Sequence, residues 1–147
     1  MKQIPLDLGL ASAPTLDNFF VGPNADAVQH LQLWIGSNNS NNSSGSGSGS
    51  GIGSGGKQSE LRSPVPTYLW GPAGSGKSHL LMAAHTALRE QGELPGWIDA
   101  SRHDHPDYND NWAAVLLDDV HLYTASQQQL AFSWFVQAQT LQRPVLA

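Results

Sequence analysis

The sequence predicts an α/β fold of three layers, in which helices cover both faces of a parallel sheet. Two observations predict it. After residue 66, short apolar runs alternate with helical patterns, which is the order of elements in a parallel sheet with crossover helices. In addition, a glycine-rich loop follows the first apolar run and a pair of aspartates ends the third, so polar groups gather where parallel strands end.

The N-terminal part divides into a tail and a helix. Residues 1–14 alternate apolar with polar or small side chains and end at a proline, which predicts an extended tail. From Asn24 to Ile35 apolar side chains recur at helical spacing, and Asn24 is a favourable N-cap residue. We therefore expect the folded core to start at Thr15 and to contain an amphipathic helix close to its beginning.

A low-complexity segment interrupts the core at residues 36–56. It contains eight Gly, eight Ser, four Asn and one Ile. This composition buries too little apolar surface to offset the entropy cost of ordering the chain, so a flexible linker is predicted. The domain assignment is therefore a tail over residues 1–14 and one core over residues 15–147, interrupted by the linker.

Six further elements are predicted from apolar spacing and from the turn residues beside them. They are a strand at 67–70, a helix at 77–90, strands at 96–99 and 113–117, a helix at 126–141 and the opening of a strand at 144–147. The apolar faces of the helices are expected to pack on the sheet. The five Trp residues are expected to lie in this core.

The glycine-rich loop matches the pattern G-x-x-x-x-G-K-[ST] between a strand and a helix. Its residues are Gly71, Pro72, Ala73, Gly74, Ser75, Gly76, Lys77 and Ser78. The glycines let backbone N–H groups turn inward around phosphate oxygens, and the helix that follows adds the positive end of its dipole. We expect Lys77 to reach the β- and γ-phosphates and the Ser78 hydroxyl to bind Mg²⁺. The loop thus predicts a site for ATP or ADP with Mg²⁺.

The strand at 113–117 ends in Asp118 and Asp119. A buried parallel strand places such residues at the sheet edge, beside the glycine loop. Asp118 is expected to hold Mg²⁺, and Asp119 is the candidate catalytic residue that orients or deprotonates an attacking water. Asp is also common at turns and helix N-caps, but the upstream glycine loop favours the functional interpretation.

Histidines are not expected to belong to the site. Those at positions 79, 85 and 121 are interpreted as packing or surface residues. The cluster from His103 to Asp107 lies in a polar loop with a proline, and it is interpreted as a solvated loop rather than a metal site.

Charge and composition exclude several classes of protein. Seven Lys and Arg residues against twelve Asp and Glu residues give a formal net charge of −5, and the basic residues are scattered, so no autonomous DNA binding is expected. The chain has no Cys, which excludes disulfides and thiolate metal sites. No apolar run is long enough to span a membrane, and the N-terminus does not read as a signal peptide, so we expect a cytoplasmic protein without a membrane partner.

Three segments resemble the AAA+ ATPase core of the bacterial replication initiator DnaA and its relatives. They are residues 15–24 (TLDNFFVGPN), residues 68–78 with the glycine loop, and residues 116–122 (LLDDVHL). The resemblance implies a P-loop NTPase fold of AAA+ type, in which Phe20 and Val21 border the adenine base. An ordinary core position fits Phe19 and Phe20 equally well.

In this family the core continues with a sensor residue, an arginine finger and a helical lid. The resemblance therefore implies that the chain is truncated before the lid at Ala147. Because an arginine finger contributes roughly 10³ to 10⁵ in rate, we expect the covered chain to be a poor ATPase.

The tail places Gln3, Leu6 and Leu8 at a spacing similar to the peptide by which regulators of this family bind the DNA polymerase sliding clamp. The two leucines would fill an apolar groove while the Gln3 amide makes directional hydrogen bonds. The resemblance implies a replication-control protein with the sliding clamp and DnaA as partners, which promotes hydrolysis of DnaA-bound ATP. Two alternatives stay open, a fragment of a DnaA-type initiator and a helicase-loader ATPase.

Overall fold

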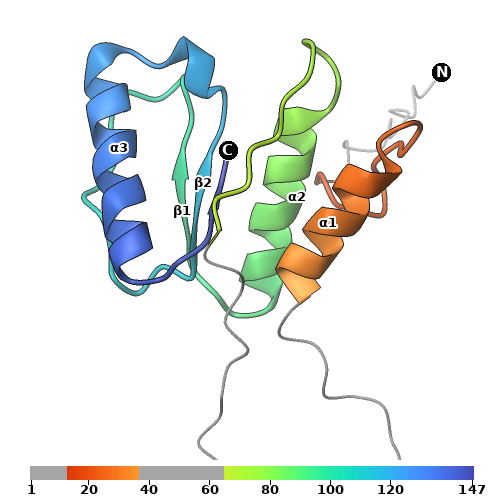
Figure 1. Ribbon diagram of the computed structural model, residues 1–147, viewed down its shortest axis with the longest axis horizontal. Helices are drawn as coiled ribbons and strands as arrows, with labels where there is room; N and C mark the ends of the chain where they lie inside the picture. The colour runs from red at the N-terminus through yellow and green to blue at the C-terminus, as the bar shows by residue number, and fades with distance from the viewer. Residues whose placement is uncertain (1–12, 37–64) are drawn as a thin grey trace, which may run out of the picture.

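The computed structural model describes residues 13–36 and 65–147 (Figure 1). The tail residues Gln3, Leu6 and Leu8 and linker residues 37–56 lie outside the described residues. The elements in chain order are α1 (Ala25–Gly36), α2 (Lys77–Glu90), β1 (Pro95–Ile98), β2 (Ala114–Leu117), the 3₁₀ turn η1 (Val120–Leu122), α3 (Ala125–Thr140) and β3 (Val145–Leu146).

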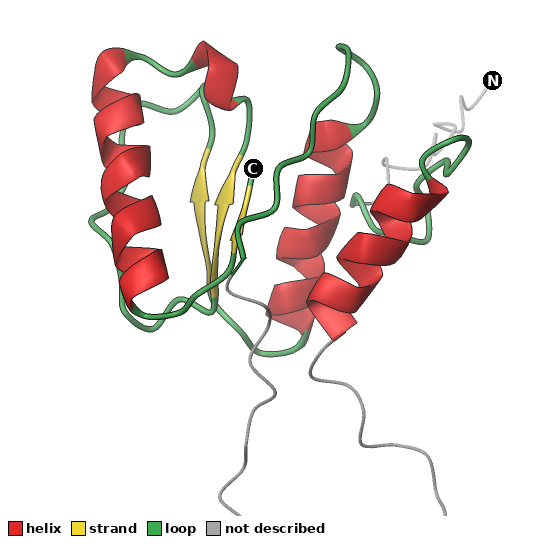
Figure 2. Ribbon diagram, in the orientation of Figure 1, coloured by secondary structure: helices red, strands yellow, loops and turns green. Residues whose placement is uncertain are grey.

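The three strands form one parallel sheet with the order β1-β2-β3 (Figure 2). In the register, Pro95 pairs with Ala114, and Val115 pairs with Val145. Because the strands are parallel, their carboxyl ends meet at one edge of the sheet, which is where α/β folds place their ligands. The α/β class with a parallel sheet is thus confirmed.

Side chains of the central strand alternate between two cores. Ala114 and Leu116 belong to a cluster with the apolar faces of α1 and α2, whereas Val115 and Leu117 belong to a cluster with α3. All four residues are buried, as expected for a strand that is covered on both faces. Figure 1 shows the resulting layers, with α1 and α2 on one side of the sheet and α3 on the other.

A capping box fixes the start of α3. Thr124 accepts a hydrogen bond from the Gln127 backbone, and the Gln127 side chain accepts one from the Thr124 backbone N–H at 2.8 Å. Gln127 is only 3% exposed, and its amide donates to the carbonyl oxygens of Asp99, Ala100 and Arg102, the last at 2.7 Å. This single side chain therefore joins the first turn of α3 to the loop after β1.

The prediction of a strand at residues 67–70 is wrong. Only Thr67 forms a β-bridge, with Leu146. Backbone hydrogen bonds still join the segment to the end of the chain, from Thr67 N to Val145 O at 2.8 Å and from Ala147 N to Thr67 O at 3.0 Å. A further bond, from Leu69 N to Ala147 O at 2.6 Å, continues this pairing to the last residue. The other elements differ from the predicted bounds by at most one residue at either end.

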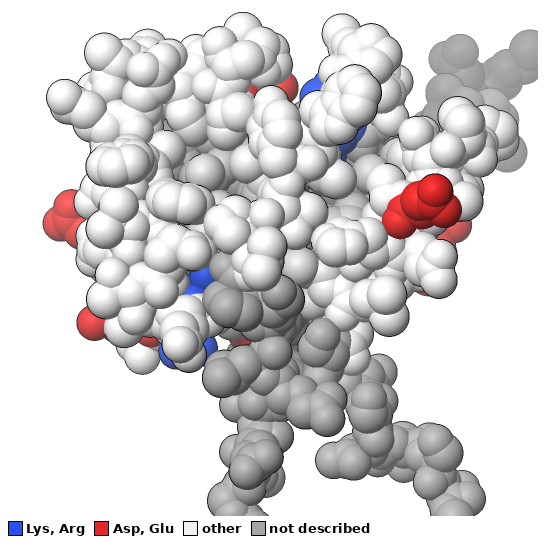
Figure 3. Space-filling model, in the orientation of Figure 1, with Lys and Arg blue, Asp and Glu red and all other residues white. Residues whose placement is uncertain are grey.

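Charged side chains are sparse on the described part of the molecule. Of the seven Lys and Arg residues, four lie in the described ranges, namely Lys77, Arg89, Arg102 and Arg143. On the face drawn in Figure 3, Lys and Arg atoms lie at separate places and most of the surface is uncharged. Within residues 13–36 and 65–147, no helix has the length and apolar character that crossing a membrane requires.

Candidate functional site

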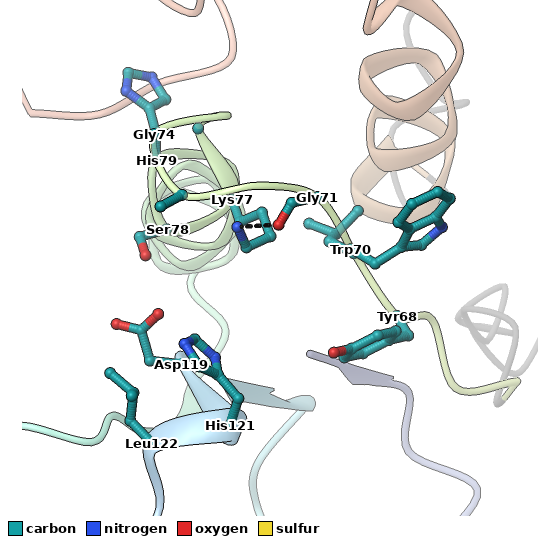
Figure 4. A pocket seen from close by; sticks show the side chains of 13 residues that line it. Tyr68, Trp70, Gly71, Gly74, Lys77, Ser78, His79, Asp119, His121 and Leu122 are labelled. Carbon is teal, nitrogen blue, oxygen red and sulfur yellow. Dashed lines mark hydrogen bonds between the residues drawn. The ribbon is translucent and has the colours of Figure 1, made fainter.

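The glycine loop forms one wall of a cavity of about 660 Å³ (Figure 4). Asp119 and the turn η1 form the facing wall, and Tyr68 lies to one side. A volume of this size is typical of sites for small molecules and cofactors. The cavity therefore lies between the loop and the carboxyl end of β2, where two of the predicted motifs meet.

The loop backbone at Gly76 requires glycine for two reasons. Its φ of 92° is in the left-handed region, and a Cβ at this position would lie 2.5 Å from Cε2 of Phe19. Gly76 is followed directly by α2, a helix of 14 residues whose first N–H groups face the loop. The loop thus offers backbone donors and a helix N-terminus, which fits an anionic group such as phosphate.

The ammonium group of Lys77 lies within the curve of the loop. Its Nζ donates a hydrogen bond to the carbonyl oxygen of Gly71 at 2.9 Å (Figure 4) and another to that of Pro72 at 3.0 Å. Among the described residues that line the cavity, Lys77 is the only Lys or Arg. The positive charge available to an anion here therefore comes from this one side chain together with the helix N-terminus.

Ser78 and Asp118 meet although forty positions separate them in the sequence. The Ser78 Oγ donates to Oδ1 of Asp118 at 2.8 Å, and the Asp119 backbone N–H donates to the same oxygen at 3.0 Å. Burial raises the pKa of Asp118, the hydrogen bond from Ser78 opposes that rise, and the charge of Asp119 adds to it. A buried carboxylate, a second carboxylate and a hydroxyl form a set of hard oxygen donors that fits Mg²⁺.

Asp119 adopts a conformation that is uncommon for a residue with a side chain. Its φ of 51° and ψ of 41° lie in the left-handed region. After this residue the chain turns, so that Asp119, His121 and Leu122 line the cavity while Val120 packs against the core below α3. Strained backbone of this kind is found at functional sites when the surrounding structure holds it in place.

Six residues that were not predicted as site residues also line the cavity. They are Tyr68, Leu69, Trp70, His79, His121 and Leu122. Trp70 is 84% exposed, so the prediction that all five Trp residues lie in the core is wrong at this position. The sequence feature that could have indicated His121 as a site residue is its position two residues after Asp119, on the same short turn.

Some predicted cofactor residues lie away from the cavity. Of the eight loop residues, Pro72 and Ser75 do not line it, and neither do Phe20, Val21 and the predicted Mg²⁺ ligand Asp118. The Phe20 side chain is 89% exposed. The proposed contact of Phe20 and Val21 with the base stays a prediction.

The neighbouring Phe19 is the residue that touches the glycine loop. Its ring contacts Gly76 and lies 5.4 Å from the ring of His79, measured between centroids. The Nε2 atom of His79 is 3.0 Å from the carbonyl oxygen of Thr15. The segment before α1 therefore packs on the loop and on the first turn of α2.

Comparison with known proteins identifies a fold but no family. No family model matches the chain, and no curated protein matches it. A solved structure described as that of a DNA replication initiation factor is similar to the chain, with a TM-score of 0.60 and 19% sequence identity. The similarity covers 90% of this chain and 40% of that one, so the chain spans less than half the length of that protein. The chain therefore shares its α/β fold with that replication initiation factor.

Proposed function

We propose that the chain binds ATP or ADP together with Mg²⁺ in the cavity between the glycine loop and Asp119. The observation that carries the proposal is the 2.8 Å hydrogen bond between Ser78 and Asp118. Each residue belongs to a separate motif that points to phosphate or Mg²⁺ chemistry, and the fold brings the two together at the carboxyl edge of a parallel sheet.

Each part of the cavity has a role in this proposal. The loop N–H groups and the N-terminus of α2 hold phosphate oxygens, and Lys77 adds a charge-assisted hydrogen bond. Ser78 and Asp118 hold Mg²⁺, and Asp119 orients water. When bound, Mg²⁺ supplies positive charge that offsets the charge of the phosphates. Because Lys77 is the only described Lys or Arg in the cavity, hydrolysis by this chain alone is expected to be slow.

The Ser78→Ala variant tests the Mg²⁺ part of the proposal. We expect its affinity for ADP in the presence of Mg²⁺ to fall about tenfold, since a ligand to a charged group is lost. In EDTA its affinity should match that of the unaltered chain, because the hydroxyl then has no metal to bind. Titration calorimetry with and without Mg²⁺ measures both values.

Ser75→Ala is the matched control, because Ser75 lies in the same loop but does not line the cavity. Its affinity for ADP should be unchanged in both conditions. If the folded, unaltered chain bound neither ATP nor ADP, the proposal of a nucleotide site would be abandoned.

We further propose that the chain acts in the control of DNA replication initiation, in the manner of Hda, the regulatory inactivator of DnaA. Two observations support this role: the resemblance of residues 15–24 and 116–122 to the DnaA-like AAA+ core, and the shared fold with a replication initiation factor. In this role the chain promotes hydrolysis of DnaA-bound ATP together with the sliding clamp. A fragment of an initiator and a helicase-loader ATPase are the alternatives with the same core.

The tail separates these alternatives. A labelled peptide of residues 1–12 is expected to bind purified sliding clamp in the micromolar range. Burial of each of the two leucines contributes about 1.5 to 3 kcal/mol of binding free energy, before the cost of ordering the peptide is subtracted. A peptide with Leu6→Ala and Leu8→Ala should lose this binding. Fluorescence anisotropy measures both peptides. An absence of saturable binding at high micromolar clamp would remove the support for the Hda-like role and leave the nucleotide site as the proposal.

A further inference from the structure

We propose that His121 distinguishes ATP from ADP by donating a hydrogen bond to the terminal phosphate that only ATP carries. The inference rests on the proposed nucleotide binding and adds a residue that the sequence motifs do not include. It assigns ATP selectivity to the wall of the cavity that faces the glycine loop.

His121 is placed on that wall. It lines the large cavity together with Lys77 and Ser78, and it lines a smaller adjoining cavity of about 20 Å³ together with Lys77 and Asp119. In Figure 4 the imidazole stands beside Asp119 and points across the gap toward the loop. His121, which is exposed, therefore borders the space between the loop and the end of β2.

The turn that carries His121 is held firmly from both ends. Leu122 N donates to the carbonyl oxygen of Asp119 at 2.8 Å, which closes the 3₁₀ turn. Next in the chain, Tyr123 is 6% exposed and its hydroxyl donates to the carbonyl oxygen of Ile98 at 3.0 Å. Val120 packs in the core on the other side. Backbone and core contacts thus fix the position of the turn that carries the imidazole.

The order of groups across the cavity indicates which phosphate His121 meets. Lys77 and Ser78 lie on the side of the glycine loop, and Asp118 and Asp119 lie opposite, at the end of β2. In a P-loop the backbone amides hold the α- and β-phosphates and the Lys reaches the β- and γ-phosphates. The γ-phosphate therefore projects farthest toward the facing wall, and ADP lacks it.

Only one of the side chains that the segment after β2 contributes to the cavity is a hydrogen-bond donor. Of the three residues that the segment from Asp119 to Leu122 contributes to the cavity, Asp119 carries a carboxylate, Leu122 carries no polar atom, and His121 carries an N–H. An imidazole donates at least one hydrogen bond whether it is neutral or charged, and phosphate oxygens accept it.

The test compares the affinities of the folded chain for ADP and for a non-hydrolysable ATP analogue, both with Mg²⁺, by titration calorimetry. For His121→Ala we expect the affinity for the analogue to fall about tenfold and the affinity for ADP to change less than about twofold. His121→Gln keeps an N–H donor and should recover most of the affinity for the analogue. Tyr68→Phe removes the other side-chain donor beside this wall and should leave the ratio of the two affinities unchanged.

His85→Ala is the matched control on α2. That ring packs edge-on against Trp97, with centroids 5.6 Å apart, and it does not line this cavity, so both affinities should be retained. An equal loss for ADP and the analogue in His121→Ala, or no loss for either, would overturn the inference while the nucleotide site stands. Failure of the unaltered chain to bind ADP would instead overturn the proposed function.

Discussion

Lys77→Ala is expected to weaken the binding of both ATP and ADP by roughly 10- to 150-fold, which corresponds to about 1.5 to 3 kcal/mol for a hydrogen bond with a charged partner. Lys77 is the only described Lys or Arg that lines the cavity, so no neighbouring side chain replaces its charge. Its Nζ already lies within the loop, bonded to Gly71 and Pro72 at 2.9 and 3.0 Å. Titration calorimetry with Mg²⁺ and each nucleotide gives the measurement.

Arg89→Ala serves as the control for loss of a positive charge from the same helix. Arg89 lies in the last turn of α2, away from the loop, and its replacement should leave both affinities unchanged. Thermal melting must show that Lys77→Ala is folded, since the substitution also removes two hydrogen bonds from the loop. Full affinity in a folded Lys77→Ala protein would show that the loop does not bind phosphate.

Trp134→Ala is expected to lower the free energy of unfolding by about 3 to 5 kcal/mol. Trp134 is 1% exposed and its ring lies 4.4 Å from that of Trp112, between α3 and the sheet. Removal of the indole leaves a cavity in the core that Val115 and Leu117 cannot fill from a fixed strand. Since domains of ordinary size are stable by about 5 to 15 kcal/mol, this is a large fraction of the total. Urea denaturation followed by circular dichroism measures the change.

Phe132→Ala on the same helix tests whether the effect comes from burial. Phe132 is 68% exposed, so its replacement should change the free energy of unfolding by less than about 0.5 kcal/mol. A similar loss in both variants would mean that the structure places the faces of α3 incorrectly.

Elements with strong local signals could be predicted from the sequence. The glycine loop and the apolar spacing after it predicted a helix at 77–90, and α2 spans the same residues. The segment at 67–70 shows the limit of this reasoning, because its apolar side chains suit a strand while the ladder depends on a partner far along the chain. That partner is β3, and the local sequence around residue 67 does not specify how many residues pair with it.

Within the candidate site, the sequence motifs indicated which segments would meet but not which side chains turn inward. Ser78 and Asp118 lie together as expected from two parallel-sheet motifs, and the roles assigned to them stay predictions. Phe19 and Phe20 are identical neighbours, and only the path of the folded chain determines that Phe19 contacts the loop. His121 lines the cavity on the turn after Asp119, whose positive φ is more common for Asp than for most residues but is not fixed by the local sequence.

The attachment of α3 has a consequence for how the molecule responds to its medium. Gln127 joins this helix to the loop after β1 through an amide, which neither gains nor loses a proton under ordinary conditions. Residues Ala125–Thr140 include no Asp, Glu, Lys or Arg, so the helix presents no charge for dissolved ions to screen. Acidification or a change of ionic strength therefore leaves the helix and its Gln127 amide unaltered. It acts on carboxylates outside the helix, among them Asp99 in the loop that Gln127 reaches and the pair beside the glycine loop.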